Sequence, residues 1–389
     1  MKEHFEKFLG LGNATDNEND LLAYSYDASE MMGSARVVLF PSHEEQLRLI
    51  LSYANRTNID VVARGNGTNL MGMTIPNNSI VLCTQGLDKI HALNVREKWV
   101  NVETGVTIAE LNEALRKDGF RFPLEPFTAP QTTIGAFIAI NGCSRHSQKY
   151  GRAVDNILEL ELMDGTGKFF SVKKDFEQCV GNEGSALIIV RAKLRVIPIV
   201  DRSADLHYFD SVQEAIVFAD KVKEDKPLAI EFLDGAAATY AGIHTKHTII
   251  VEWEHADGKV RYEDYAALIK RREGVRRALG IKGFVYIDDG QLEEYARADA
   301  IEWCRKHDVP VIAHIGIGVV HPFFKKEPDE RHLWYAWLTE HQQLHAGQFG
   351  WGLRKKMYVP QALRLKIRQL KERYDYNDTL GRGKLHDYI

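Results

Sequence analysis

The loop Arg64–Thr68 has residue types that bind phosphate groups. Its sequence, Arg-Gly-Asn-Gly-Thr, combines a cation and a hydroxyl with two glycines, and Asn69 and Leu70 extend it. Glycine lets the backbone approach an anion closely, and successive amides in a turn form a concavity that binds phosphate oxygens. The loop lacks the Lys-Ser/Thr pair of a nucleoside-triphosphate loop and the Rossmann glycine spacing, so neither fold is favoured. A glycine-rich strand-to-helix turn without a ligand is the alternative.

A second stretch, from Thr128 to Gly151, carries little charge and many small residues. Gly135, Ala139 and Ser144 are examples, and such residues let the backbone pack closely against a flat or polar group. Close packing of a helix on a strand explains the same pattern equally well. The stretch by itself therefore does not distinguish a ligand site from close packing of a helix on a strand.

Two histidines, His341 and His345, are four residues apart in a segment that we expect to be helical. This spacing can bind a metal ion when both rings lie on one helix face. A solvated helix face is the simpler explanation, and we favour it.

The elements that lead into the phosphate loop predict an α/β arrangement. Val37–Pro41 is an apolar strand, Ser42–Glu45 predicts a capping box, and the helix that follows has apolar residues at helical spacing. Ile59–Ala63 then returns as a strand. This order predicts a parallel pair of strands with the loop at a carboxyl end, where ligand sites of α/β proteins usually lie.

The middle of the chain predicts antiparallel hairpins. Ile90–Val95 and Trp99–Glu103 form one candidate, and Ile157–Met163 with Lys168–Val172 forms another around an Asp-Gly turn. Beyond residue 200, apolar strands alternate with amphipathic helices, which predicts an α+β sheet with helices on one side.

Composition limits the class of protein. The chain has 389 residues and a net charge of −4, and 27% of its residues are charged, with both signs interspersed. The sequence therefore shows no extended basic face of the kind that binds nucleic acid. No apolar run approaches a membrane span and no signal-peptide pattern is present, so we expect a cytoplasmic protein without an integral membrane segment. The cysteines form no Cys-x-x-Cys pair, which argues against an iron–sulfur cluster within this chain.

Five short motifs follow one another along the chain: Tyr26–Ser29, Arg64–Thr68, Thr132–Ala136, Asn141–Ser144 and Gly181–Ser185. Taken together and in this order, they resemble the motifs of the FAD-linked oxidases of the vanillyl-alcohol-oxidase type, which have a PCMH-type FAD-binding domain. Within that family, the chain is most similar to the branch of glycolate oxidase FAD subunits, D-lactate dehydrogenases and D-2-hydroxyglutarate dehydrogenases.

The resemblance implies an α+β fold with three parts. Residues 1–199 would form the PCMH-type FAD-binding domain, built from two α/β subdomains. Residues 200–360 would form a C-terminal α+β cap domain for the substrate, and residues 361–389 would return to the FAD domain as a helix and tail.

The resemblance also implies an FAD site on the first domain. Its expected residues are Arg64, Gly65, Asn66, Gly67, Thr68, Asn69, Leu70, Pro130, Thr132, Thr133, Ile134, Gly135, Asn141, Gly142, Ser144, Tyr150, Glu183, Gly184 and Ile188. Covalent flavin attachment in this superfamily often uses a histidine near the diphosphate loop. No histidine lies between His43 and His91, so we expect noncovalent FAD.

In the resembled branch, two histidines and a glutamate bind a divalent metal, and a neighbouring histidine accepts the hydroxyl proton. His314 and His321 keep the two histidine positions, whereas Gln348 replaces the glutamate and Phe349 replaces the base. An amide lacks the carboxylate's charge and a phenyl ring cannot accept a proton, so metal-assisted catalysis loses support. The two histidines could still share a zinc ion, or they could be structural.

Other residues of the same region suggest how a substrate would be held. Arg354 and Lys355 could bind a substrate carboxylate, as basic residues do in the family, or they could belong to a solvated loop. Phe349 and Trp351 could face an apolar or aromatic substrate, or pack in the core.

The sequence therefore predicts an FAD-dependent oxidoreductase that oxidises a 2-hydroxy acid of the D-lactate or glycolate type by hydride transfer to noncovalent FAD. Its partners would be a small-molecule substrate and an electron acceptor such as a quinone, a cytochrome, an electron-transfer flavoprotein or an iron–sulfur subunit. One alternative is oxidation of another alcohol. A second alternative is a catalytically degenerate flavin-binding subunit that partners an iron–sulfur protein.

Overall fold

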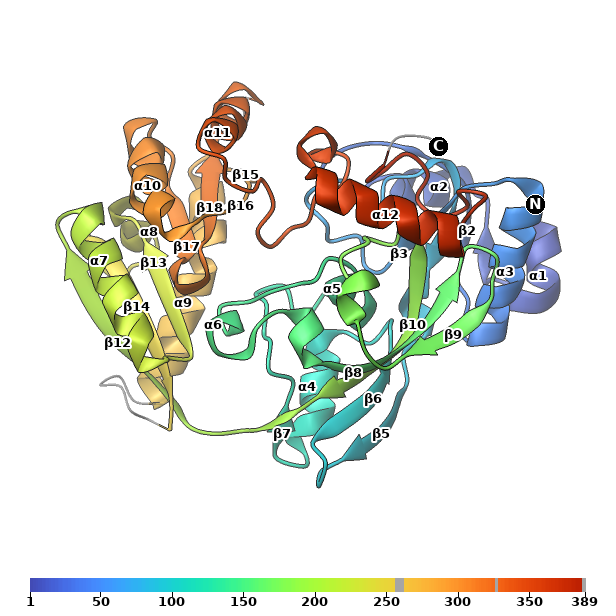
Figure 1. Ribbon diagram of the computed structural model, residues 1–389, viewed down its shortest axis with the longest axis horizontal. Coiled ribbons are helices and arrows are strands. Elements are labelled where there is room, and N and C mark those ends of the chain that lie inside the picture. The colour runs from blue at the N-terminus through green and yellow to red at the C-terminus, as the bar shows by residue number, and fades with distance from the viewer. Residues whose placement is uncertain (256–261, 326–327, 387–389) are drawn as a thin grey trace.

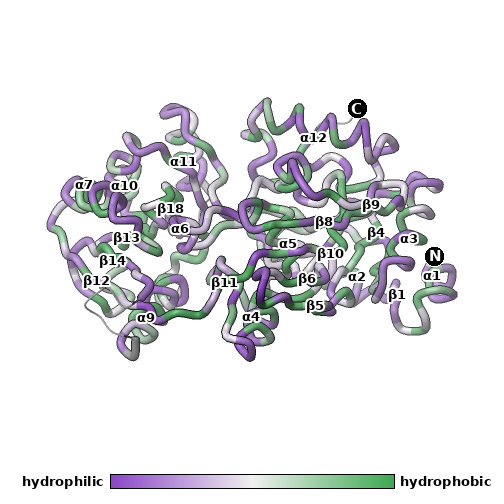
Figure 2. Tube along the Cα trace, turned by 60° about the horizontal axis from the view of Figure 1, so that its bottom comes forward, coloured by the Kyte–Doolittle hydropathy of each residue, from purple (hydrophilic) through white to green (hydrophobic). Residues whose placement is uncertain are grey.

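The computed structural model of the protein describes residues 1–255, 262–325 and 328–386. The chain forms two lobes that lie side by side (Figure 1). The first lobe contains two main sheets, a short two-stranded sheet (Phe120–Arg121 with Ile197–Pro198) and the C-terminal helix, and the second lobe contains a single larger sheet. Hydrophobic segments are gathered in the interior of each lobe, as Figure 2 shows.

The first sheet has the strand order β1-β2-β4-β3. Its members are β1 (Ala14–Thr15), β2 (Ser34–Leu39), β4 (Asn77–Cys83) and β3 (Val61–Arg64). Both β2 and β3 run parallel to β4, which lies between them. The prediction that the two outer strands pair directly is therefore wrong, because a later strand is inserted between them. The phosphate loop still begins at the carboxyl end of β3.

The helix between these strands, α3 (Glu44–Thr57), buries Leu47, Ile50 and Leu51 against the sheet. Its N-cap residue is His43, which makes no side-chain capping bond. Instead, the Gln46 side chain accepts a hydrogen bond of 2.8 Å from the Ser42 amide. The prediction of a capping box is thus wrong. A side chain in the first turn of the helix, that of Gln46, binds the preceding backbone instead.

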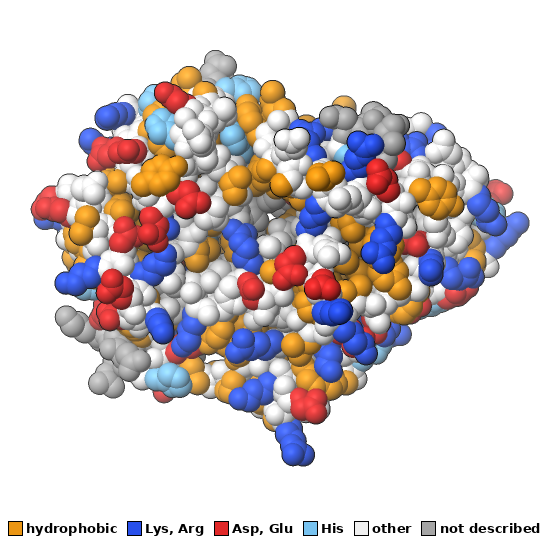
Figure 3. Space-filling model, in the orientation of Figure 1, with side chains coloured by type: hydrophobic (Ala, Val, Ile, Leu, Met, Phe, Trp, Pro, Cys, Tyr) orange, Lys and Arg blue, Asp and Glu red, His pale blue; other side chains and the backbone are white. Residues whose placement is uncertain are grey.

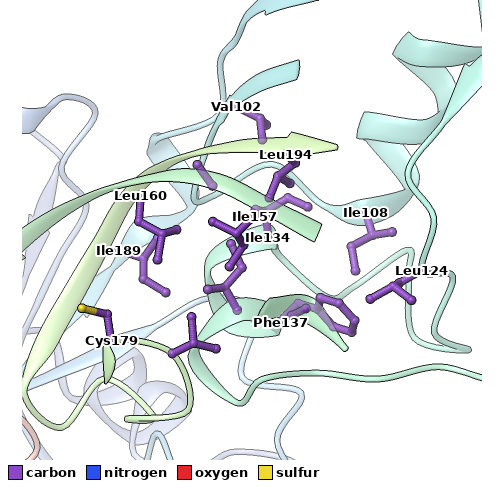
Figure 4. Close-up of a cluster of buried hydrophobic side chains, with 14 of the residues drawn as sticks. Val102, Ile108, Leu124, Ile134, Phe137, Ile157, Leu160, Cys179, Ile189 and Leu194 are labelled. Carbon is purple, nitrogen blue, oxygen red and sulfur yellow. The ribbon is translucent and has the colours of Figure 1, made fainter. Parts of the chain in front are cut away.

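The second sheet is antiparallel, with the order β5-β6-β10-β8-β9. Its strands are β5 (Ile90–Asn94), β6 (Trp99–Glu103), β10 (Leu187–Arg195), β8 (Ile157–Asp164) and β9 (Phe169–Val172). Both predicted hairpins are confirmed. Two helices, α4 (Ile108–Arg116) and α5 (Ile134–Ala139), pack on this sheet, and Figure 4 shows Ile134 and Phe137 of α5 within the buried cluster.

The third sheet forms the second lobe and has the order β12-β14-β13-β17-β18-β15, with β16 also paired to β18. Its strands are β12 (Arg202–Phe209), β14 (His247–Glu254), β13 (Ala229–Leu233), β17 (Val311–His314), β18 (Val319–Phe324), β15 (Tyr286–Ile287) and β16 (Gly290–Gln291). All of its described pairings are antiparallel.

Helices cover both faces of the third sheet, so the prediction of helices on one side is wrong. One face packs against α7 (Val212–Val222), α10 (Arg297–Lys306) and α11 (Pro328–Glu340). The other face packs against α8 (Gly235–Tyr240) and α9 (Tyr262–Ile281). The apolar residues of successive strand positions alternate between these two cores, since strand side chains alternate in direction.

The chain returns to the first lobe through α12 (Gln361–Tyr374), which lies across the top of that lobe in Figure 1. Ile367 and Leu370 of α12 join the core of the second sheet. Beyond the helix, Leu380 forms a parallel bridge with Val61, and the Val61 amide donates a 2.7 Å hydrogen bond to the Thr379 carbonyl. The C-terminal segment thus pairs with β3, the strand that carries the phosphate loop.

Shorter elements complete the described chain: α1 (Lys2–Leu9), α2 (Glu18–Tyr24), β7 (Phe120–Arg121), α6 (Ser147–Tyr150) and β11 (Ile197–Pro198). Basic and acidic side chains are intermixed over the face drawn in Figure 3, in agreement with the charge pattern of the sequence. Within the described residues, no helix is both long and apolar enough to cross a membrane.

Candidate active site

A cleft between the lobes brings the phosphate loop to the third sheet. It holds about 1690 Å³ of space outside protein atoms, including its open mouth. The first lobe supplies the loop after β3, the segment around α5 and the segment 183–189. The second lobe supplies side chains of α9, β17 and β18 and of the segment 348–349.

Most of the residues expected to bind FAD line this cleft. They are Arg64, Gly65, Asn66, Gly67, Thr68, Asn69, Leu70, Thr132, Gly135, Ser144, Glu183, Gly184 and Ile188. They come from three separate segments of the chain, and the fold brings these segments to one wall.

The phosphate loop fits a diphosphate. Within the described residues, the amides of 66–70 donate no hydrogen bond, so a turn of free N–H groups is available to an anion. Arg64 is fixed behind the loop, where its guanidinium donates to the Tyr26 carbonyl at 2.6 Å and to Thr74 Oγ1 at 3.2 Å. Gly67 has φ of +65°, and a Cβ there would lie 2.1 Å from the Arg64 guanidinium. Only glycine suits this position.

The small-residue stretch also fits a closely approaching ligand. Thr133 caps α5 by accepting a hydrogen bond from the Ala136 amide. A Cβ on Gly135 would lie 1.5 Å from Thr104 Oγ1, so the helix start packs tightly on the second sheet. This close packing leaves Thr104, Gly135 and Ala136 together on the cleft wall.

Six of the expected FAD residues do not line the cleft. Pro130 is exposed, Thr133 is the buried cap of α5, and Ile134 lies in the core of the second sheet. Asn141 lines a separate cavity behind the cleft wall, and Gly142 packs on the Phe137 ring. Tyr150 donates a 2.7 Å hydrogen bond to Glu254 of the second lobe. We propose that these residues shape the site without touching the cofactor.

The flavin is expected to come away from the chain on denaturation. The structure places no histidine on the phosphate loop, and His43 is the N-cap of α3. Precipitating the FAD-loaded protein with acid should therefore leave the flavin absorbance in the supernatant. Flavin that stays on the precipitate after washing would overturn noncovalent binding.

Glu183 joins the cleft wall to the segment that returns from the second lobe. Its carboxylate accepts hydrogen bonds from the amides of Trp351, at 2.7 Å, and Gly352, at 2.9 Å. Burial raises the pKa of Glu183 from its ordinary value of 4.5 to about 7, against the effect of these bonds. Glu183 thus lies at the junction between the lobes and changes its protonation near neutral pH.

This pKa shift predicts a pH dependence of stability. Between about pH 4.5 and 7 the folded protein binds more protons at Glu183 than the unfolded chain does, so this group's contribution to stability falls as pH rises. The unfolding free energy of the wild type minus that of Glu183→Gln should therefore decline across this range and level off on either side. Denaturant titrations of both proteins at several pH values measure it, and a difference that rises with pH would contradict the shift.

On the opposite wall, His314 is held by a buried carboxylate. Its Nδ1 lies 2.7 Å from Glu231 Oε1, and Arg272 Nη2 lies 2.5 Å from Glu231 Oε2. Burial raises the pKa of Glu231, but the charges of Arg272 and His314 outweigh burial and lower it overall. An ionised carboxylate can only accept, so Nδ1 of His314 donates to Glu231, and Nε2 is the ring nitrogen left for a ligand.

His321 lies beside His314, with the two ring centroids 5.3 Å apart and the rings nearly perpendicular. Burial and the neighbouring His314 lower the pKa of His321 to about 3, so this ring is neutral at ordinary pH. Its Nδ1 is buried and has no hydrogen-bond partner within the described part of the chain. His321 is also among the residues that line the cleft, so a ligand there would lie beside this ring.

The side chains around the two histidines do not fit a divalent metal well. Gln348 directs its amide Nε2 to the Cys143 carbonyl at 3.0 Å, and Phe349 supplies no donor atom. Within residues 1–255, 262–325 and 328–386, no group of three or more His, Cys, Asp or Glu side chains is placed to hold a metal ion. We therefore derive no step through a metal at His314 and His321.

Arg354 and Lys355 are not among the residues that line the cleft. The Arg354 guanidinium donates to the Ser29 carbonyl of the first lobe at 2.5 Å. Lys355 is fully buried and pairs with Asp288 Oδ1, at 2.7 Å, and with Asp289. We propose structural roles for both, in place of the substrate contact expected from the sequence.

Three residues on or behind the second-lobe wall are not predicted from the sequence. Glu231 is an acidic residue within an otherwise apolar strand, a signal that could have identified it. Arg272 and Arg276 lie one helical turn apart on α9, within a run of basic residues that resembles a solvated face. Arg276 is half-buried in the cleft, where its guanidinium makes no hydrogen bond or ion pair with any described residue.

Part of the first lobe matches a known protein family. Residues 35–173 match the FAD binding domain family. The chain is 28% identical over 233 residues to D-lactate dehydrogenase of Archaeoglobus fulgidus, covering 55% of this chain and 52% of that protein. It is 26% identical to glycolate oxidase subunit GlcD of Bacillus subtilis, covering 60% and 53%. The chain thus spans about half the length of these curated relatives.

A third relative is D-2-hydroxyglutarate dehydrogenase of Haemophilus influenzae, 32% identical over 41% of this chain and 16% of that protein. Among solved structures, alkyldihydroxyacetonephosphate synthase superposes with a TM-score of 0.75 over 97% of this chain and 84% of that one, at 16% identity. That likeness shows the fold, which is of the PCMH type. Residues 35–173 thus match the FAD binding domain family, which implies FAD as the cofactor, and the chain has a PCMH-type fold.

Proposed function

We propose that the protein is an FAD-dependent oxidoreductase that oxidises a 2-hydroxy acid of the D-lactate or glycolate type. The observation that carries the proposal is that one cleft is lined both by the loops expected to bind FAD and by His314, which pairs with the buried Glu231 behind it. The names of the relatives, which are dehydrogenases and an oxidase subunit for hydroxy acids, point to the same chemistry.

Bound FAD would supply a hydride acceptor in this cleft. The amides of residues 66–70 would hold its diphosphate, and Thr104, Gly135 and Ala136 would lie along its other parts. The second-lobe wall would then face the cofactor across the space left for the substrate.

His314 would accept the proton of the substrate hydroxyl at Nε2. Loss of that proton makes departure of hydride from the α-carbon easier, and Glu231 stabilises the imidazolium that forms. His321 is neutral and lines the cleft beside His314, where its ring would help to position the substrate. The charge of Arg276, which no described carboxylate neutralises, would bind the substrate carboxylate.

Electrons would then leave to an acceptor other than NAD. A quinone, a cytochrome, an electron-transfer flavoprotein or an iron–sulfur subunit would serve. The chain carries no nucleotide-binding Rossmann motif that would favour NAD.

Anaerobic mixing tests the proposal. The FAD-loaded protein is mixed with D-lactate, glycolate and D-2-hydroxyglutarate while the flavin absorbance is followed. Bleaching by any of these acids supports the proposal. No bleaching by these or by a wider panel of hydroxy acids contradicts it, and bleaching by simple alcohols alone would assign a different alcohol substrate.

The absence of bleaching by any alcohol would favour a flavin-binding subunit that works with an iron–sulfur protein. The replacements Gln348 and Phe349 give this second candidate its support, because both remove groups that the resembled enzymes use. A metal assay on the same preparation separates the metal question from the flavin chemistry.

A further inference from the structure

One side of the cleft is formed by an apolar patch, which consists of Ile287, Ile312, Phe323 and Phe349 of the second lobe with Leu70 of the first. The first three belong to the core under α9, and the other two are half-buried against it. Ile287, Ile312 and Phe323 are 9%, 5% and 0% exposed, so they form the packed base of the patch, while Leu70 and Phe349 provide its accessible apolar surface.

The register of the third sheet places this patch beside the two histidines. Ile312 precedes His314 by two residues on β17, and it pairs directly with His321 on β18. Phe323 follows His321 by two residues and pairs with Ile287 on β15. Residues two apart on a strand share a face, so the histidines and the patch face the same side of the sheet. A ligand that contacts His314 and His321 must lie next to the patch.

Phe349 is fixed where its ring continues the patch. Its amide donates to Asp289 Oδ2 at 2.8 Å, and its carbonyl accepts from Asn69 Nδ2 of the phosphate loop at 2.9 Å. The ring centroid lies 5.0 Å from that of His321. Because its backbone is held from both lobes, the phenyl ring presents a rigid apolar surface next to the proposed catalytic group.

Most described arginines near the patch are paired with carboxylates, and one remains to bind a substrate anion. Arg272 is paired with Glu231, and Arg145 is paired with Glu252 and Glu273, both at 3.0 Å. Arg276 is the cation of α9 in the cleft that lacks such a partner within the described residues. A second carboxylate on the substrate would meet the apolar patch and lose its hydration without compensation.

We infer that the preferred substrates are 2-hydroxy acids with an apolar side chain, branched or aromatic, which packs on the patch while the carboxylate binds Arg276. This inference rests on the proposed function and names the substrate class of that site. It predicts that acids with larger apolar side chains are better substrates than glycolate, D-lactate or D-2-hydroxyglutarate.

A homologous series tests the inference. The FAD-loaded protein is reduced anaerobically with glycolate, D-lactate, D-2-hydroxy-4-methylpentanoate, D-3-phenyllactate and D-2-hydroxyglutarate, and kcat/KM for flavin reduction is compared. Each buried methylene contributes about fourfold to such a ratio, so the branched acid should exceed D-lactate by on the order of tenfold to a hundredfold. Equal or falling values from D-lactate to the larger acids would overturn the inference and leave the proposed function intact.

A binding measurement covers the case in which no acid reduces the flavin. Propionate, 4-methylpentanoate and 3-phenylpropionate lack the reacting hydroxyl, and their binding is followed by the change in flavin absorbance. Tighter binding of the two larger acids without any reduction would refute the proposed reaction but support the apolar subsite. Equal binding of all three, or none, would refute the subsite.

A variant pair ties the preference to the patch. Phe349→Ala should lower the ratio of kcat/KM for D-3-phenyllactate to that for D-lactate by about tenfold, and Phe349→Leu should restore much of it. Phe284 is the matched control, since it is a half-buried phenylalanine packed on the same core and does not line the cleft. Phe284→Ala should leave the ratio unchanged. A loss of the same size in both alanine variants would assign the effect to packing and contradict the inference.

Discussion

His314→Asn is expected to slow anaerobic reduction of the bound flavin by about 10²–10⁴-fold, the usual contribution of a positioned general base. The asparagine side chain can still hydrogen-bond to Glu231, which lies 2.7 Å from Nδ1 in the wild type, but it cannot accept a proton. Stopped-flow absorbance with the best substrate measures the rate, and flavin content is measured on the same samples. FAD binding should be unchanged, because the phosphate loop lies on the other lobe.

His341→Asn is the control for this prediction. His341 is also a histidine of the second lobe, but its ring stacks on Trp337 and does not line the cleft. Its replacement should leave the rate of reduction unchanged. Glu231→Gln should give a smaller loss than His314→Asn, since it removes the charge that stabilises the imidazolium while keeping the base. If His314→Asn reduces flavin at the wild-type rate, the proton is accepted elsewhere.

Lys355→Met is expected to lower the free energy of unfolding by about 3–5 kcal/mol, because it leaves buried Asp289 without its cation and leaves Asp288 with Arg331 alone, at 3.2 Å. Lys355 is 0% exposed, as are its partners Asp288 and Asp289. Burial alone would lower the pKa of Lys355, but the two carboxylates raise it. Asp289 also accepts hydrogen bonds from the amides of Gly347, Gln348 and Phe349, so the cation stabilises the turn that carries Phe349.

Denaturant unfolding of the FAD-loaded protein measures this effect. Lys173→Met is the matched control, since the Lys173 side chain is 72% exposed and lies 3.5 Å from Glu159, and such surface pairs contribute about 0–1 kcal/mol. If Lys355 instead binds the substrate carboxylate, its replacement would raise KM and leave stability near that of the wild type. A structural role for Lys355 therefore predicts lower stability, whereas a substrate-binding role predicts a higher KM at nearly unchanged stability.

The part of the site that depends on local chain geometry could be predicted from sequence. A phosphate loop needs particular glycines next to particular polar groups, and Gly67 shows the reason, since any side chain there would meet Arg64. Hairpins are also local, so β5–β6 and β8–β9 followed from alternation and turn residues.

The part of the site that depends on distant contacts could not be predicted. Sequence gives no sign that β4 inserts between β2 and β3, because strand order is decided by packing across the whole sheet. Glu231 and His314 are 83 positions apart, and only the pairing of β13 with β17 brings them together. Lys355 appeared to belong to an exposed basic run, since its partners at 288 and 289 lie far away in the sequence.

The pairing of Leu380 with Val61 has a consequence for how the protein is made on the ribosome. The strand that carries the phosphate loop is synthesised before the second lobe, but its outer edge is covered by the segment around Leu380, which follows that lobe in sequence. Lys384 is likewise buried and donates to the Met73 carbonyl, just beyond that loop. The FAD-binding lobe therefore completes its native contacts only after the second lobe has been synthesised, whereas the second lobe is continuous in sequence and can fold as a unit.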